Sequence, residues 1–214
     1  IARMNNHVIL GIDRCGIVGE DGETHQGIYD ITFLLPIPNL IISTPKDSIE
    51  AGNLIYTAML SKRPFAIRYS KDRLKYLHKK YEIVPIGSWE ILEAGKDAIL
   101  ITYGNLIQNA KIIKSKLKNI DLSIVNARYQ KPIDEKLFNK ILSTYNHIFI
   151  YEEQTIINSL GSFLVNYANE HNYKGNIKLF AIKDEYILQG KKEEILKELE
   201  LDSDSIVKKI KKNM

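Results

Sequence analysis

Short apolar runs alternate along the chain with longer stretches in which apolar residues recur every three or four positions. Short runs are typical of buried strands, and the longer stretches are typical of amphipathic helices. The short runs lie at 7–12, 40–43, 65–69, 98–103, 122–126, 147–151 and 177–182. This alternation predicts an α/β fold with two doubly wound, mostly parallel sheets flanked by helices.

The helical stretches carry recognisable faces and caps. One face is formed by Leu106, Ala110, Ile113 and Leu117, which are spaced by four, three and four residues. Asp134 is expected to cap the helix that follows it, and Asp202 or Ser203 is expected to cap the last helix, because a side-chain oxygen at this position accepts a free backbone N–H.

A polar, Lys-rich stretch between residues 70 and 82 shows neither a short apolar run nor apolar residues at helical spacing. Such stretches commonly connect domains. We therefore expect two domains, at 1–82 and 83–214, and we expect the second to fold independently. The 214 residues are enough for both to bury a core.

Composition excludes several classes of protein. No apolar run reaches the roughly 18 residues of a transmembrane helix, and residues 1–7 do not form a signal peptide. The single cysteine, Cys15, cannot form an internal disulfide and suits a reducing compartment, so we expect a cytoplasmic protein without membrane contact. The net charge of +4 comes largely from Lys clusters interleaved with Ile and Leu, so no nucleic-acid partner is expected.

The densest group of chemically active side chains lies between Asp13 and Gly27, directly after the first apolar run. Ligands bind to such loops in open α/β sheets. Arg14 suits a phosphate or carboxylate, Asp21 is a carboxylate, and the imidazole of His25 can transfer protons near neutral pH. The spacing is neither an EF-hand nor a P-loop, so the residues alone leave an active-site loop and a simple turn equally open.

The order of these residues, Asp-Arg-x-Gly-Ile-Val-Gly-x-Asp-Gly-x-Thr-His-Gln-Gly, resembles the signature of the pyrimidine-binding domain of the 1-deoxy-D-xylulose 5-phosphate synthase family. The similarity continues in register through 33–45, 64–69, 85–87, 125–134, 151–154, 160–162 and 184–190. It therefore covers essentially the whole chain.

The resemblance implies an enzyme that condenses pyruvate with D-glyceraldehyde 3-phosphate and releases CO2, for isoprenoid, thiamin and pyridoxal synthesis. In the family, thiamin diphosphate with Mg2+ supplies the carbanion chemistry, and the full-length enzyme is a homodimer. The matching His25 and Asp21 would handle protons above the thiazolium, and the matching Arg14 would hold the acceptor phosphate. Where the family has a second Arg, this chain has Lys71, which keeps the positive charge but lacks the forked guanidinium donors of Arg. Asp72 replaces a glycine of the family.

Two parts of the family site are absent from this sequence. They are the diphosphate–metal motif, Gly-Asp-Gly followed by Asn, and the segment with the Glu that activates the aminopyrimidine. We therefore expect no metal ligands in this chain, no thiamin diphosphate or Mg2+ bound to it alone, and no activity of the isolated polypeptide.

Two alternatives are kept beside this interpretation. A transketolase or the β subunit of a 2-oxoacid dehydrogenase would share the fold and a pocket His, although Gly27 directly after His25-Gln26 favours the synthase. A non-catalytic assembly subunit is the second alternative. Glu152 and Glu153 are expected to lie at a strand end and to meet the first domain or a partner subunit.

Overall fold

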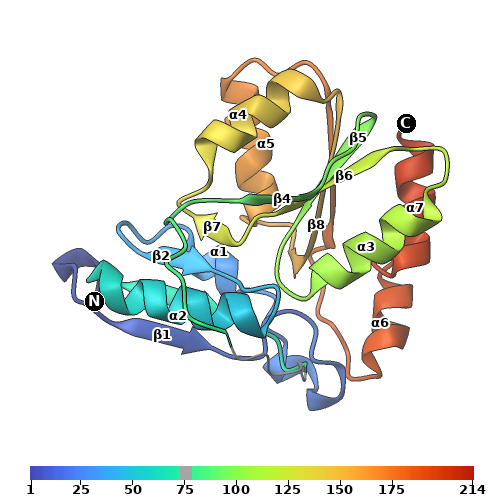
Figure 1. The fold of residues 1–214 in the computed structure, drawn as a ribbon. Helices are drawn as coiled ribbons and strands as arrows, with labels where there is room; N and C mark the ends of the chain where they lie inside the picture. Colours follow the sequence, from blue (N-terminus) through green and yellow to red (C-terminus); the bar gives the residue numbers. More distant parts are fainter. Residues whose placement is uncertain (73–78) are drawn as a thin grey trace.

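Two sheets organise the chain in the computed structural model, which describes residues 1–72 and 79–214 (Figure 1). The first sheet has the order β1-β3-β2-β7 and the second has the order β4-β6-β5-β8-β9. The strands are β1 Ile9–Ile12, β2 Ile41–Ser43, β3 Phe65–Arg68, β4 Glu90–Glu93, β5 Ala98–Thr102, β6 Leu122–Asn126, β7 Tyr129–Lys131, β8 His147–Thr155 and β9 Asn176–Ile182. All pairs are parallel except β2 with β7 and β4 with β6, so the expected mostly parallel sheets are confirmed.

The helices pack around these sheets. They are α1 Asp30–Leu34, α2 Ser48–Ser61, α3 Leu106–Lys116, α4 Glu135–Thr144, α5 Leu160–Glu170, α6 Lys192–Glu198 and α7 Ser203–Lys212, with short 3-10 turns η1 Ala2–Met4, η2 Gly19–Asp21 and η3 Glu23–His25. The predicted caps are confirmed: Asp134 accepts from the backbone N–H of Leu137, and Asp202 accepts from those of Asp204 and Ser205. None of the described helices has both the length and the apolar character that a bilayer crossing needs.

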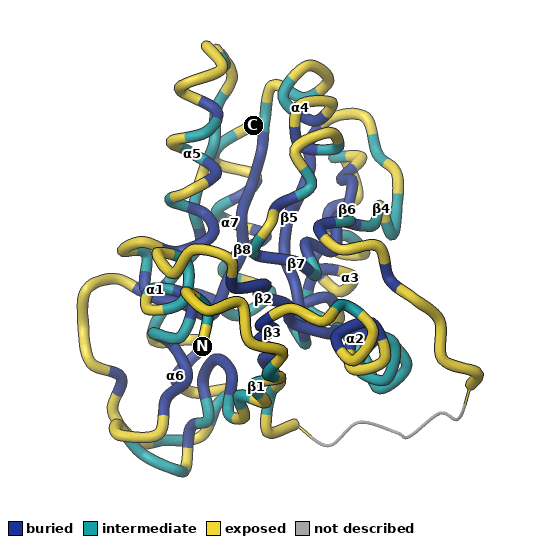
Figure 2. The backbone as a smooth tube through the Cα atoms, turned by 90° about the vertical axis from the view of Figure 1, so that its left-hand side faces the viewer, coloured by how far each residue is buried: buried dark blue, intermediate teal, exposed yellow. Residues whose placement is uncertain are grey.

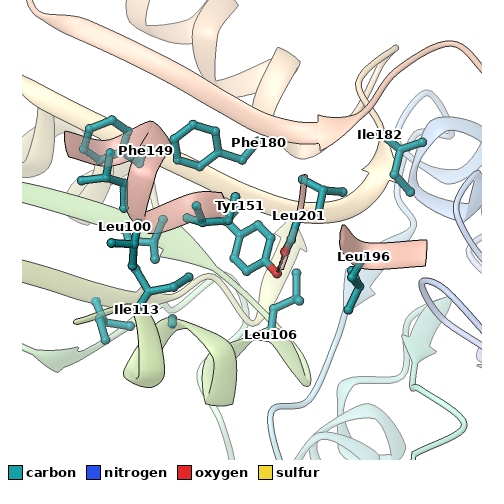
Figure 3. Packing of buried hydrophobic residues seen from close by; sticks show 14 of the residues in the cluster. Leu100, Leu106, Ile113, Phe149, Tyr151, Phe180, Ile182, Leu196 and Leu201 are labelled. Atoms are coloured by element: carbon teal, nitrogen blue, oxygen red, sulfur yellow. Dashed lines mark hydrogen bonds between the residues drawn. The ribbon is translucent and has the colours of Figure 1, made fainter. Parts of the chain in front are cut away.

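The central strands of the second sheet are buried on both faces (Figure 2). On one face, Leu100 and Phe149 pack under α3, α6 and α7, where the hydroxyl of Tyr151 donates to the carbonyl of Leu201 at 2.6 Å (Figure 3). This two-sided burial explains why the sequence shows these strands as continuous apolar runs.

The opposite face of the second sheet shares one core with the first sheet. Ile99 and Ile101 belong to the same buried cluster as Ile41 and Phe65 from the first sheet. The two halves of the chain therefore share one hydrophobic core, and no solvent-filled boundary separates them. The predicted linker falls partly on residues 73–78, which lie outside the described residues.

Two strands were not predicted from the sequence, and both are edge or polar strands. β4 has only two apolar residues and pairs with one neighbour, and β7 has the sequence Tyr-Gln-Lys. β7 follows β6 in the chain but pairs with β2, so the second half of the chain completes the sheet of the first half. Local pattern cannot predict such a pairing, because it depends on the tertiary contact.

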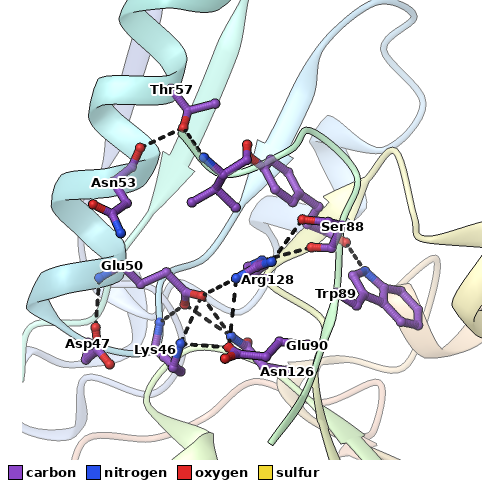
Figure 4. Close-up of polar contacts among 12 residues, drawn as sticks. Lys46, Asp47, Glu50, Asn53, Thr57, Ser88, Trp89, Glu90, Asn126 and Arg128 are labelled. Atoms are coloured by element: carbon purple, nitrogen blue, oxygen red, sulfur yellow. Dashed lines mark hydrogen bonds and ion pairs between the residues drawn. The ribbon is translucent and has the colours of Figure 1, made fainter. Parts of the chain in front are cut away.

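A buried polar network also joins the halves (Figure 4). Glu50 on α2 is only 3% exposed and accepts hydrogen bonds from Lys46, Asn126 and Arg128. Lys46 and Arg128 also approach Glu90 on β4, at 2.9 and 3.8 Å. A carboxylate this deeply buried requires such partners, since its desolvation is otherwise uncompensated.

We predict that Glu50→Ala lowers the free energy of unfolding by about 3 kcal/mol, because it leaves two cations and an amide without their shared acceptor. Urea unfolding followed by circular dichroism measures this. Glu170→Ala, at the exposed end of α5, is the matched control and should change stability by less than about 0.5 kcal/mol. Equal effects of the two variants would contradict a stabilising role for the network.

Candidate functional site

The Gly-rich loop begins directly after β1 and is closed at its base by its own backbone. Gly16 and Gly27 exchange two backbone hydrogen bonds, both of 2.9 Å. A Cβ at Gly27 would lie 2.0 Å from the carbonyl oxygen of Arg14, so only glycine fits there. The loop therefore projects as one closed unit from the carboxyl end of the first sheet, where α/β proteins bind ligands.

Two cations converge on one carboxylate at the surface of this loop. Arg14 Nε lies 3.0 Å from Asp21 Oδ2, and Lys71 Nζ bonds the other oxygen, Oδ1. Arg14 also reaches Asp13, and its own backbone has φ 58°, in the left-handed region that non-glycine residues rarely adopt. Three of the predicted site residues, Arg14, Asp21 and Lys71, are thus brought together.

The protonation state of Asp21 follows from these contacts. Hydrogen bonds from Lys71 and from Arg14 lower the pKa of Asp21 below its ordinary value. At neutral pH the side chain is a carboxylate, which accepts protons and hydrogen bonds but does not donate them.

His25 takes a different position in the loop. It ends the turn η3 and is exposed, and the hydrogen-bond partner of its ring within the described part of the chain is the hydroxyl of Thr24, at 3.0 Å. The structure does not join His25 to the Arg14–Asp21–Lys71 cluster by a hydrogen bond. Its predicted catalytic role stays a prediction.

The end of β8 supports the loop from beneath. Glu153 Oε2 accepts from the backbone N–H of Ile17 at 3.0 Å, which confirms that this residue meets the first part of the chain. Gln154 donates to the carbonyl of Gly27 at 2.8 Å and accepts from Ile31, a role that sequence reasoning missed. Burial raises the pKa of Glu153.

Glu152, by contrast, accepts hydrogen bonds from Tyr103 and from the backbone N–H of Gly161, both within the second half of the chain.

Arg68 is a fixed structural cation rather than a free ligand-binding group. Its side chain is fully buried, and it donates to Asp30 at 3.1 Å and to the carbonyl of Gly27 at 3.2 Å. Burial raises the pKa of Asp30, and the neighbouring guanidinium counters this. Arg68 therefore stabilises the base of the loop, and Arg14 and Lys71 are the cations of the cluster at its surface.

A cavity of about 410 Å³ opens beside the charged cluster, and its wall includes Ile17, Glu20, Lys71 and Asp72. A second hollow of about 550 Å³, with a more apolar wall, lies between α2 and the strands β1 and β3 and shares Asp72 with the first. Among residues 1–72 and 79–214, no group of three or more His, Cys, Asp or Glu side chains is placed to hold a metal. The site is therefore one of cations and carboxylates beside an open cavity.

We predict that Lys71→Met raises the pKa of Asp21, because the largest cause of its lowering is the bond from Lys71. Carboxyl 13C chemical shifts recorded between pH 2 and 6 measure this directly. Since the folded-state pKa is lowered, the ion pairs stabilise the fold above the ordinary Asp pKa, and this stabilisation disappears as the pH falls through the lowered value. An unchanged titration of Asp21 in Lys71→Met would contradict the arrangement.

The comparisons with known proteins agree with this architecture. Residues 1–75 match the model of the transketolase pyrimidine binding domain, and residues 87–206 match that of the transketolase C-terminal domain. A split-gene transketolase, solved as an inactive β4 tetramer, has a TM-score of 0.86 and 21% identity. That likeness covers 100% of this chain and 69% of the other, and it shows the shared fold.

Sequence relatives carry the resemblance further. The chain is 38% identical over 216 residues to the 1-deoxy-D-xylulose-5-phosphate synthase of Bacillus cereus (strain AH820), covering 98% of this chain and 34% of the relative. The synthase of Lysinibacillus sphaericus (strain C3-41) is 39% identical over 213 residues, covering 97% and 34%. The resemblance to this family of synthases is confirmed, and the chain spans about a third of the length of these relatives. Because transketolase domain models match residues 1–75 and 87–206, the chain belongs to the transketolase family.

Proposed function

We propose that this chain acts as part of a 1-deoxy-D-xylulose 5-phosphate synthase, in which its loop 13–27 and Lys71 bind the phosphate of D-glyceraldehyde 3-phosphate. The observation that carries the proposal is the convergence of Arg14 and Lys71 on one carboxylate at the edge of an open cavity. The similarity of the whole chain to these synthases supports the substrate class.

The carboxylate of Asp21 marks where an anion fits between the two cations. Arg14 offers a planar fork of donors and Lys71 a compact point charge, a combination that suits the oxygens of a phosphate monoester. Both cationic side chains are well exposed, at 41% and 54%, so solvent screens their pairs with Asp21. A doubly charged phosphate can therefore replace the carboxylate, which then becomes an acceptor for a substrate hydroxyl.

The remaining chemistry is assigned to groups outside the charged cluster. Thiamin diphosphate would supply the carbanion derived from pyruvate, and Mg2+ would hold its diphosphate. We propose that neither binds to this chain alone, that the chain alone is inactive, and that the whole enzyme is a cytoplasmic homodimer. The imidazole of His25 would move protons of the bound substrate.

We predict that Arg14→Met and Lys71→Met each weaken binding of D-glyceraldehyde 3-phosphate about tenfold, since each removes a charge-assisted hydrogen bond. Isothermal titration calorimetry on the chain measures this. Lys111→Met, on the exposed surface of α3, is the matched control. Asp21→Asn should tighten binding of inorganic phosphate, because the two cations lose their internal counter-ion. The phosphate assignment would be overturned if Arg14→Met and Lys71→Met bound D-glyceraldehyde 3-phosphate as tightly as Lys111→Met, and if Asp21→Asn bound inorganic phosphate no more tightly than the parent chain.

The reaction itself is tested in a chimera in which this chain replaces the matched third of the Bacillus cereus relative. With both cofactors present, we expect CO2 release from pyruvate that depends on D-glyceraldehyde 3-phosphate, and a fall in kcat of about a hundredfold in His25→Asn. The chain alone should release none. Product from the chain alone would refute its inactivity, and a chimera indifferent to His25 would refute the role of that residue.

A further inference from the structure

Three segments that are far apart in the sequence meet at Lys192, the first residue of α6. Its Nζ lies 3.3 Å from Asp72 Oδ2 and 3.7 Å from Glu153 Oε2. Asp72 is the neighbour of Lys71 in the chain, and Glu153 holds the backbone N–H of Ile17. The ammonium group of Lys192 thus connects the segment that carries Lys71 with the carboxylate that binds the loop 13–27.

Backbone packing fixes the same junction. A Cβ at Gly19 would lie 2.8 Å from the carbonyl oxygen of Gly190 and 3.0 Å from the backbone nitrogen of Lys192. The side-chain amide of Gln189 donates to the carbonyl of Glu20 at 2.9 Å. Residues 189–192 therefore press directly on the turn η2, which ends at Asp21.

The charges make Lys192 important to this junction. Glu153 is only 4% exposed, and its Oε1 is buried without a hydrogen-bond partner among the described residues. A buried carboxylate that loses its cationic neighbour is strongly destabilised. Lys192 is itself mostly buried, with 24% of its side chain exposed, so solvent screens this contact less than the surface pairs of Asp21.

We propose that Lys192 is a positioning residue, which holds the loop 13–27 and the Lys71–Asp72 turn at the separation that lets Arg14 and Lys71 share one anion. The identity of the anion rests on the proposed function, but the positioning does not. Lys192 acts through its ion pairs with Glu153 and Asp72, and its side chain also lines the cavity beside the charged cluster.

The single cysteine of the chain reports on this positioning. Cys15 lies in the loop between Arg14 and Gly16, is 7% exposed, and is close enough to Glu153 and Lys192 for both to influence its titration. Burial raises the pKa of its thiol to about 11. Because the side chain is buried and its thiol is mostly protonated, alkylation at pH 8 is slow while the loop is closed, and its rate reports how often the loop opens.

The test is the rate of iodoacetamide labelling of the native chain at pH 8, followed by intact mass. We expect Lys192→Met to label about tenfold faster than the parent chain, since the junction loses its cation. Lys192→Arg, which keeps the charge, should restore slow labelling. Lys191→Met is the matched control and should leave the rate unchanged, because the side chain of Lys191 is 70% exposed and pairs only loosely with Glu194, at 3.9 Å.

Labelling of Lys192→Met at the parent rate would overturn the proposal, as would an equal acceleration in Lys191→Met. Where Lys192→Met fails to fold, Asp72→Asn takes its place, because it removes the more exposed partner of Lys192 and leaves Glu153 paired. Faster labelling in that variant supports the proposal, and an unchanged rate overturns it.

Calorimetry with inorganic phosphate separates this inference from the proposed function. Weaker phosphate binding in Lys192→Met, together with faster labelling, supports both. If neither the parent chain nor any variant binds phosphate, but Lys192→Met still labels faster, the positioning role is supported. The same result counts against the proposed phosphate site. Unchanged labelling with intact phosphate binding overturns the positioning role alone.

Discussion

The carboxyl end of β8 determines the geometry of the loop that carries the candidate site. Glu153 and Gln154 are buried there and bond backbone groups of Ile17, Gly27 and Ile31. A buried carboxylate and amide need these partners, because leaving them unpaired costs the full desolvation of each group. The loop follows β1 in the chain, but its position is set by a strand of the other sheet. The two halves of the molecule must therefore be assembled before the charged cluster can form.

The predicted domain boundary near residue 82 does not divide the interior of the molecule. The family models match on either side of it, but the interior does not divide there, since Ile41 and Ile99 share one core and β7 completes the first sheet. A polypeptide beginning at residue 83 would expose the apolar face of β5 to water. Its independent folding, which the sequence suggested, stays a prediction. The network around Glu50 adds a polar contact across the same junction.

The sequence predicted what depends on local pattern and on motif order. β5 and β6 were found because both faces are buried, which makes each strand a continuous apolar run. The edge strand β4 was missed because only half of its residues are apolar. Arg14, Asp21 and Lys71 were found from their place in a known motif, and the structure brings them together. Gln154 and Lys192 were missed because their partners lie far away in the sequence, where no periodicity can reveal them.

The site consequently has two layers with different physical behaviour. In the upper layer, the side chains of Arg14 and Lys71 are exposed, so their ion pairs with Asp21 are weak and screened by solvent. In the lower layer, Glu153 is buried against Lys192, and loss of either charge would destabilise the packing that fixes the position of the loop. A phosphate can compete with a surface carboxylate only if the cations stay in place when that carboxylate leaves. The fixed lower layer supplies this condition, because it holds the loop and the Lys71 turn independently of what occupies the space between the cations.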